Sequence, residues 1–153
     1  MDYTITINPE NWETFLKTKP LKFAFRATML CYVRKLEISD RLVVYLAKEM
    51  VWCGIFNVSK IPYRTDKITY PCGPSFCYVV EVAPVFLPEP SSYIPIKEPL
   101  LWSTLERFHG MNHTLSGWIY NAKLARSLCK ISTLDTDKIL DFFNQQFMKK
   151  ERK

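Results

Sequence analysis

The side chains best suited to chemistry in this sequence are aromatic rings that lie close to cations along the chain. Six rings are not clearly needed by the helices and strands that the sequence predicts: Phe23, Phe25, Trp52, Tyr63, Phe76 and Tyr78. Nucleobases stack on such rings, and a base held outside its duplex needs a ring face and hydrogen-bonding groups at its edge. Burial in the core is the simpler interpretation of any one ring taken alone.

Polar and charged groups suited to a nucleic acid are also present. Asn8 and Asn11 could contact the edge of a base, although a helix cap explains Asn8 better. Six cations could contact phosphates: Lys22, Arg26, Arg34, Lys35, Arg64 and Lys67. The chain has 21 Lys and Arg against 15 Asp and Glu, a net charge of +6, which favours polyanionic partners.

Sequence signatures of enzymes are missing. The chain has no glycine-rich phosphate loop, no H-E-x-x-H and no G-x-S-x-G motif. Its two histidines, His109 and His113, are one helical turn apart and could share a metal, but no third ligand accompanies them. Asp135 and Asp137 are explained by the start of a helix. We therefore expect a binding protein without catalysis and without a cofactor.

The cysteines do not indicate a disulfide framework or a zinc site. Five are present, an odd number: Cys31, Cys53, Cys72, Cys77 and Cys129. Only Cys72 and Cys77 are close in sequence, and no second pair completes four ligands. Thiols of this kind are typical of a reducing compartment, and no apolar run predicts a membrane span or signal peptide. We expect a cytoplasmic protein without bound metal.

The first half of the chain predicts mainly strands. Residues 3–7 alternate between apolar and polar β-formers, and Asn8 with Pro9 then begins a helix that ends near Pro20. The apolar residues of segment 21–36 recur with neither a strand nor a helix period, so this segment predicts a loop with a short helix or turn. Apolar runs at 42–47 and 51–58 predict a central hairpin, and residues 76–85 predict another strand after a long proline-rich loop.

The second half predicts helices. Three sets of apolar residues fit helix faces: Leu100, Leu101, Leu105 and Phe108; Trp118, Ala122, Ala125 and Cys129; Ile139, Phe143 and Phe147. Ser132 or Thr133 can cap the last helix. Strands mostly followed by helices indicate an α+β fold with a curved mixed sheet or small barrel. We expect one domain over residues 1–148, followed by a basic tail or linker at 149–153.

Several segments, taken in order, resemble EVE domains. Residues 3–13, YTITINPENWE, resemble the family's opening strand and its N-x-E-N-W-E helix start. Residues 39–45, SDRLVVY, resemble its G-D-K-L-V-I-Y strand, and residues 53–58, CGIFNV, resemble its V-G-I-Y-E-V strand. Residues 78–85 and 121–128 follow in the family's order. EVE domains belong to the PUA-like superfamily with YTH and ASCH domains, so the resemblance implies a curved sheet or pseudo-barrel flanked by helices.

The resemblance also implies a ligand and a site. It implies binding of modified nucleic acid in a base pocket formed by an Asn on the first helix, here Asn11, and by two aromatic residues. The first aromatic falls at Phe23, where the family usually has the Trp of W-x-G-V, and the second at Phe76 or Tyr78. Phe25, beside Phe23, is a further pocket candidate. EVE-like domains also occur as N-terminal specificity modules of McrB-type restriction systems, which implies an AAA+ NTPase domain following in a longer chain as an alternative to a stand-alone protein.

Three other functions fit the same residues. A PUA-like module that binds structured or modified RNA would use the same charge and rings, and would prefer RNA to modified DNA. An enzyme of nucleotide metabolism related to ASCH domains would turn over modified nucleosides. An interaction domain whose rings are all core would not bind nucleic acid at low salt. We expect none of these three as the first choice. The expected function is recognition of a modified or flipped base in DNA, with RNA binding as the alternative.

Overall fold

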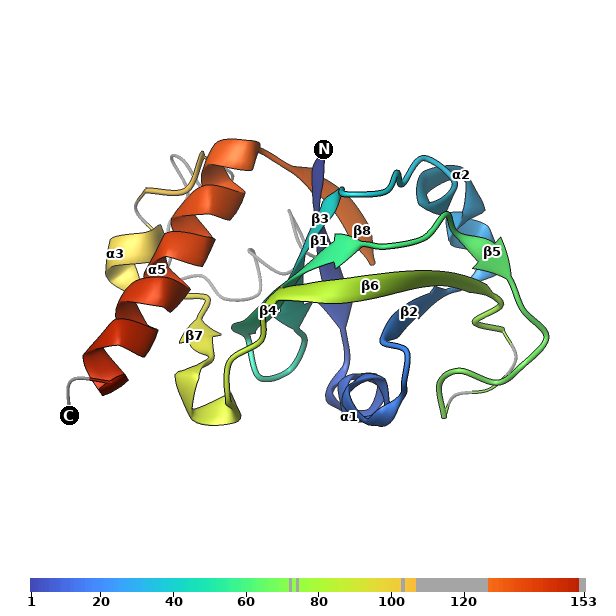
Figure 1. The fold of residues 1–153 in the computed structure, drawn as a ribbon, viewed down its shortest axis with the longest axis horizontal. Helices are drawn as coiled ribbons and strands as arrows, with labels where there is room; N and C mark the ends of the chain where they lie inside the picture. Colours follow the sequence, from blue (N-terminus) through green and yellow to red (C-terminus); the bar gives the residue numbers. More distant parts are fainter. Residues whose placement is uncertain (72, 74, 103, 107–126, 152–153) are drawn as a thin grey trace.

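A curled, mixed β-sheet forms the body of the protein (Figure 1). The computed structural model of the chain describes residues 1–71, 73, 75–102, 104–106 and 127–151. The strands are β1 (Asp2–Ile7), β2 (Lys22–Phe25), β3 (Arg41–Leu46), β4 (Val51–Val58), β5 (Tyr63–Arg64), β6 (Tyr78–Phe86), β7 (Ile94–Pro95) and β8 (Leu128–Ile131). The helices are α1 (Pro9–Lys17), α2 (Leu30–Val33), α3 (Pro99–Trp102) and α5 (Thr133–Glu151), with 3₁₀ turns η1 (Ala27–Met29) and η2 (Pro90–Ser92).

The order of the strands curls the sheet into a half-barrel. The main path runs β2-β6-β4-β3-β1-β8, with β5 on β6 and β7 on β4. All described pairings are antiparallel except that of β1 with β3, which is parallel from Asp2 opposite Arg41 to Ile7 opposite Leu46. Helix α1 connects β1 to β2, which are consecutive in the chain but are not hydrogen-bonded neighbours in the sheet. The predicted α+β class with a curved mixed sheet is confirmed.

Two apolar clusters cover opposite faces of the central strands. Alternate residues of β3 divide between them, since Leu42 and Val44 belong to one cluster and Val43 and Tyr45 to the other. Side chains of successive strand residues point to opposite faces, so a strand buried on both faces reads as a continuous apolar run. The predicted central hairpin over 42–47 and 51–58 is therefore confirmed as β3 and β4.

The last helix is fixed at its start by the predicted cap. The Ser132 hydroxyl accepts a hydrogen bond from the Asp135 backbone amide at 3.1 Å, and the buried Asp135 carboxylate accepts one from Glu106 N at 2.8 Å. Arg41 joins this helix to the sheet, because its guanidinium donates to Asp2 at 2.8 Å and to Asp137 at 2.7 Å. Arg41 thus connects the start of α5 to Asp2, the first residue of β1.

Three sequence-based expectations differ from the structure. Residues 22–25, expected in a loop, form β2, because pairing with β6 satisfies their backbone and all but Lys22 are buried. Of the helix expected at 100–108, residues up to Trp102 lie in the four-residue α3 and residues 104–106 are not α-helical, whereas Phe108, like Trp118, Ala122 and Ala125 of the next expected helix, lies outside the described residues. Cys129 was assigned to a helix face but lies in β8, which pairs with β1. The domain boundary expected after residue 148 stays a prediction; helix α5 continues to Glu151, and Lys150 Nζ donates to Ser91 at 3.2 Å.

Candidate functional site

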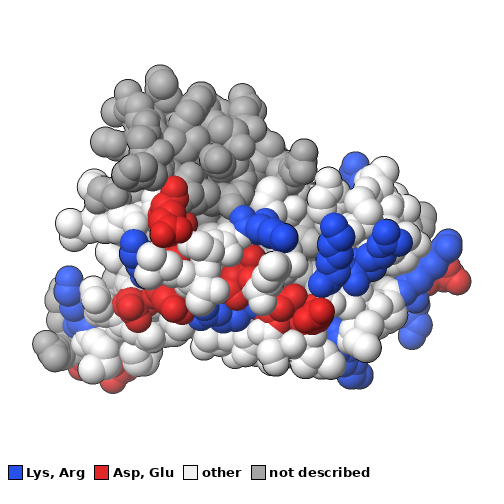
Figure 2. All heavy atoms as spheres, turned by 90° about the horizontal axis from the view of Figure 1, so that it is seen from above, with Lys and Arg blue, Asp and Glu red and all other residues white. Residues whose placement is uncertain are grey.

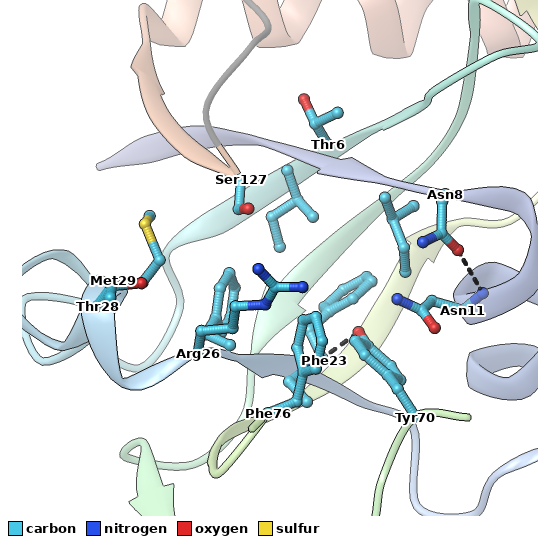
Figure 3. Close-up of a pocket in the computed structure, with 14 residues that line it drawn as sticks. Thr6, Asn8, Asn11, Phe23, Arg26, Thr28, Met29, Tyr70, Phe76 and Ser127 are labelled. Carbon is cyan, nitrogen blue, oxygen red and sulfur yellow. Dashed lines mark hydrogen bonds between the residues drawn. The ribbon is translucent and has the colours of Figure 1, made fainter. Parts of the chain in front are cut away.

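A pocket with a volume of about 360 Å³ lies between β1 and β2, and is called the β1–β2 pocket below (Figure 3). Its lining comes from β1 (Ile5, Thr6, Ile7), the start of α1 (Asn8, Asn11), β2 (Phe23, Ala24, Phe25), the following turn (Arg26, Thr28, Met29), the loop before β6 (Tyr70, Phe76) and Ser127 before β8. This volume falls within the range of small-molecule sites, about 300–1,000 Å³. The pocket exists because α1 carries the chain from β1 to β2 without pairing them.

One wall of the β1–β2 pocket combines an aromatic ring with a cation. The Arg26 guanidinium carbon lies 5.0 Å from the centroid of the Phe76 ring, within the range of cation–π attraction. Tyr70 packs against Phe76 with ring centroids 5.2 Å apart at 61°, and its hydroxyl accepts a hydrogen bond from the Ala24 backbone amide at 3.0 Å. Sequence reasoning missed Tyr70 as a pocket residue, because nothing in the sequence indicates that its loop returns to β2.

Two asparagines stand at the α1 end of the same pocket. Asn8 is the helix cap, since its Oδ1 accepts a hydrogen bond from the Asn11 backbone amide at 2.8 Å, as the sequence predicted. The Asn11 side chain is 5% exposed and points toward the pocket (Figure 3). An amide carries two donors and an acceptor with two lone pairs, the groups that read the edge of a base.

Replacing the cap should weaken the fold measurably. We expect Asn8→Ala to lower the free energy of unfolding by about 1 kcal/mol, because the Asn11 amide loses its acceptor at the start of α1. Chemical denaturation measures the change. Asn144→Ala, at an exposed position within α5, is the matched control and should cost less. Equal stability of the Asn8 variant and the parent would contradict a stabilising cap.

Phe23 and Phe25 belong mainly to the core. Phe23 is 1% exposed and stacks on Phe15 with centroids 4.2 Å apart and an interplanar angle of 8°. Phe56 meets both rings edge-on, at 5.5 Å from Phe23 and 5.2 Å from Phe15. Phe25 is also buried. Both residues contribute to the lining of the β1–β2 pocket, but the ring of Phe23 already has a stacking partner within the protein.

The other aromatic candidates lie elsewhere. Tyr78 pairs with Phe25 across β2 and β6 and is half-buried, but it is not among the lining residues of the β1–β2 pocket. Trp52 is fully buried in the second apolar cluster, and Tyr63 is exposed on β5. Burial, together with the hydrogen bond that Tyr63 donates to Glu81 and the charge of that carboxylate, raises the pKa of the Tyr63 phenol, so this side chain is neutral at physiological pH.

The predicted cations divide between the pocket and the surface. Arg26 lines the β1–β2 pocket, and Lys22 is half-buried on β2 opposite Glu81. The remaining four are exposed: Arg34, Lys35, Arg64 and Lys67. On the face seen in Figure 2, the blue Lys and Arg side chains are more numerous toward the end that carries α2 and β5 in Figure 1.

The described part of the chain contains no group of three or more His, Cys, Asp or Glu placed to hold a metal ion. Cys31, Cys53, Cys77 and Cys129 are free thiols, and burial raises the pKa of Cys53 well above its ordinary value. Cys72, His109 and His113 lie outside the described residues. Among the helices that the structure describes, none has the length and apolar character needed to cross a membrane.

Comparison with known proteins finds similarity in fold and not in sequence. No protein-family model and no curated protein matches the chain. The DUF55 domain of human thymocyte nuclear protein 1 matches with a TM-score of 0.60 at 14% identity, covering 94% of this chain and 98% of that one. The same human protein in complex with 5-methylcytosine-containing DNA matches with a TM-score of 0.57 at 14% identity, covering 93% and 96%.

A second kind of neighbour is a YTH domain. That of the Zygosaccharomyces rouxii MRB1 protein, in complex with N6-methyladenosine RNA, has a TM-score of 0.60 at 13% identity and covers 93% of this chain and 86% of that one. Identities this low establish the fold alone. The PUA-like fold implied by the resemblance to EVE domains is therefore confirmed.

Proposed function

We propose that this chain is a nucleic-acid-binding module that holds a flipped, modified base in the β1–β2 pocket, with modified DNA as the first candidate ligand. The observation that carries the proposal is the meeting of three kinds of group in one cavity: the Phe76 ring with Arg26 over it, the Asn11 amide, and an apolar wall of Ile5, Ile7 and Met29. A ring face binds the base by stacking, and an amide reads its edge.

The apolar wall suits a methylated base in particular. Burying a methyl group against apolar side chains is favourable by about 0.8 kcal/mol per carbon, which is enough to prefer a methylated base several-fold. The fold neighbours solved with 5-methylcytosine DNA and with N6-methyladenosine RNA support a ligand of this class. Arg26 is the one charged residue among the described residues that line the pocket, so an acidic cage for a cationic base is not built from them.

A binding screen tests this proposal. The probes are single-stranded and duplex DNA with 5-methylcytosine or N6-methyladenine, the corresponding RNAs with N6-methyladenosine or 5-methylcytidine, and unmodified strands of the same sequences. We expect one modified base to bind several-fold more tightly than its unmodified counterpart. Tighter binding of RNA than of DNA would favour the alternative, a PUA-like RNA-binding module. Equal affinity for modified and unmodified strands would overturn base recognition.

The proposal also states that the module binds without catalysis. Incubation with the preferred modified strand should leave the base unchanged by mass spectrometry. A role as the N-terminal specificity domain of an McrB-type restriction system is a narrower proposal that rests on the sequence resemblance to EVE domains. Its test is whether the same polypeptide, or an adjacent gene, encodes an AAA+ NTPase.

Affinity should fall steeply as salt is added. The exposed cations between positions 22 and 67 can each release a counterion from a phosphate, so we expect a slope of log K against log salt of about −3 to −6. Arg34→Glu should reduce the steepness by at least about one unit and weaken all sequences alike. Lys149→Glu, on the exposed part of α5, is the control and should leave the slope unchanged. A slope near zero for the parent would contradict phosphate binding.

A further inference from the structure

A second pocket, with a volume of about 320 Å³, is lined in part by residues close in the chain to those of the first and is called the α2–β8 pocket below. Its described lining consists of Tyr3, Tyr32, Lys35, Leu128, Cys129 and Lys130. Three short stretches of the chain therefore supply walls to both pockets. Along β1, Ile5 lines the first pocket and Tyr3 the second; after β2, Met29 lines the first and Tyr32 the second; at β8, Ser127 lines the first and Leu128 the second.

The separation of these walls along β1 is within the reach of neighbouring nucleotides once one base has left the stack. Tyr3 and Ile5 are two residues apart on one face of β1, which separates them by about 6.6 Å. Successive nucleotides of one strand are about 3.4 Å apart in a stacked duplex, and they separate further when a base leaves the stack. This separation is consistent with a neighbouring nucleotide at the α2–β8 pocket when a base lies in the β1–β2 pocket.

The chemistry of the α2–β8 pocket suits a nucleotide. Tyr32 is 39% exposed, so part of this residue is accessible, and Lys35 after α2 and Lys130 on β8 are exposed. Burial, followed by the charges of Asp40 and Glu37, raises the pKa of the Tyr3 phenol, so Tyr3 is a neutral hydroxyl. The nearby Asp40 carboxylate is paired with the Met1 ammonium group at 2.9 Å. Lys35 and Lys130 are the charged residues among the described residues that line this pocket.

We propose that the α2–β8 pocket binds the nucleotide adjacent to the flipped base, with its base against the Tyr32 ring and its phosphate between Lys35 and Lys130. The inference rests on the proposed function and adds a second subsite to it. The protein then binds two consecutive nucleotides, so the neighbour of the modified base contributes to affinity. Because the two lysines flank one phosphate, the contribution depends on which side of the modified base that neighbour stands.

The test compares ligands of increasing length. The probes are 5-methyl-2′-deoxycytidine, the two dinucleotides that place a thymidine before or after it, and a five-nucleotide strand with 5-methylcytosine at its centre; N6-methyladenosine probes replace them if the screen selects that base. One dinucleotide should bind roughly five- to a hundred-fold more tightly than the nucleoside, as expected for one more stacked base. Tyr32→Ala and Lys130→Ala should each remove much of this gain and leave nucleoside affinity unchanged.

Controls separate failure of this inference from failure of the proposed function. Tyr32→Trp keeps a ring and should keep the gain, and Lys149→Ala, an exposed lysine on α5, should change nothing. Dinucleotides that bind no more tightly than the nucleoside would overturn the second subsite and leave the proposed function intact. If no modified probe binds better than its unmodified counterpart, the proposed function fails and the second subsite fails with it.

A chemical measurement reports on the subsite directly. Cys129 is a half-buried free thiol in the lining of the α2–β8 pocket. The five-nucleotide strand should slow alkylation of Cys129, followed by peptide mass spectrometry, whereas the nucleoside alone should not. Unchanged alkylation at a saturating concentration of the strand would overturn the inference.

Discussion

Phe23→Ala should lower the free energy of unfolding by about 3–5 kcal/mol, the usual cost of deleting a fully buried phenylalanine ring. The ring is 1% exposed, and it loses its stacking with Phe15 and its edge contact with Phe56. For a domain of this size the loss corresponds to a decrease in melting temperature of about 2–4 °C for each kcal/mol. Thermal and chemical denaturation measure it.

The same variant tests whether Phe23 also binds the ligand. Phe147→Ala is the control for removal of a phenylalanine, because Phe147 is 51% exposed on α5 and should lose far less stability. Below the melting temperature, the affinity of folded Phe23→Ala should remain within a few-fold of the parent, since its stacking face is used inside the protein. A small change in stability combined with a large loss of affinity would instead assign Phe23 to the ligand.

Phe76→Ala should weaken binding of the preferred modified strand by about 1–3 kcal/mol, or roughly 5- to 150-fold in Kd. Phe76 is half-buried, it faces the β1–β2 pocket, and its contacts are with Arg26 and Tyr70 at the rim of the core. Its removal should therefore cost less stability than removal of Phe23. Titration calorimetry or fluorescence anisotropy on the same oligonucleotide measures the affinity.

Ring-preserving variants distinguish stacking from packing. Phe76→Trp and Phe76→Tyr keep a π-face and should retain most of the affinity, whereas Phe76→Leu, of similar bulk without a ring, should bind as weakly as Phe76→Ala. Variants that lack the ring should also discriminate less between modified and unmodified strands. If Phe76→Leu binds as well as the parent, the base does not stack at this position.

The sequence predicted the central architecture because local signals and tertiary structure agree there. Asn8 and Pro9 begin α1 as expected, and the apolar runs of β3 and β4 are long enough to reveal a strand buried on both faces. The four residues of β2 carried no such signal. Lys22 to Phe25 are mostly apolar and aromatic, so neither a period of two nor one of 3.6 is visible, and only pairing with β6 fixes them as a strand.

The candidate site was predictable only in part, because segments that are distant in sequence form it. Asn11 and Phe76 were candidates from their residue types and again from the resemblance to EVE domains, and both line one pocket with Arg26, which the sequence had suggested only as a phosphate contact. Tyr70, Thr6 and Ser127 line it as well, from a loop, a central strand and the residue before β8. No local pattern connects these positions, because the pocket results from the curl of the sheet.

That curl has a consequence for how the protein folds. The hydroxyl of Thr4 donates a hydrogen bond to the carbonyl of Cys129, 125 positions away in the chain, and the Thr6 amide donates to Ser127 beside the pocket. Contacts this distant in sequence raise the contact order, and such domains fold in milliseconds to seconds instead of microseconds. The β1–β2 pocket therefore forms only when distant segments have met. A ligand of this pocket is linked to the folding equilibrium of the whole sheet, and at a hundred-fold excess over its Kd it adds about 2.7 kcal/mol to the free energy of unfolding.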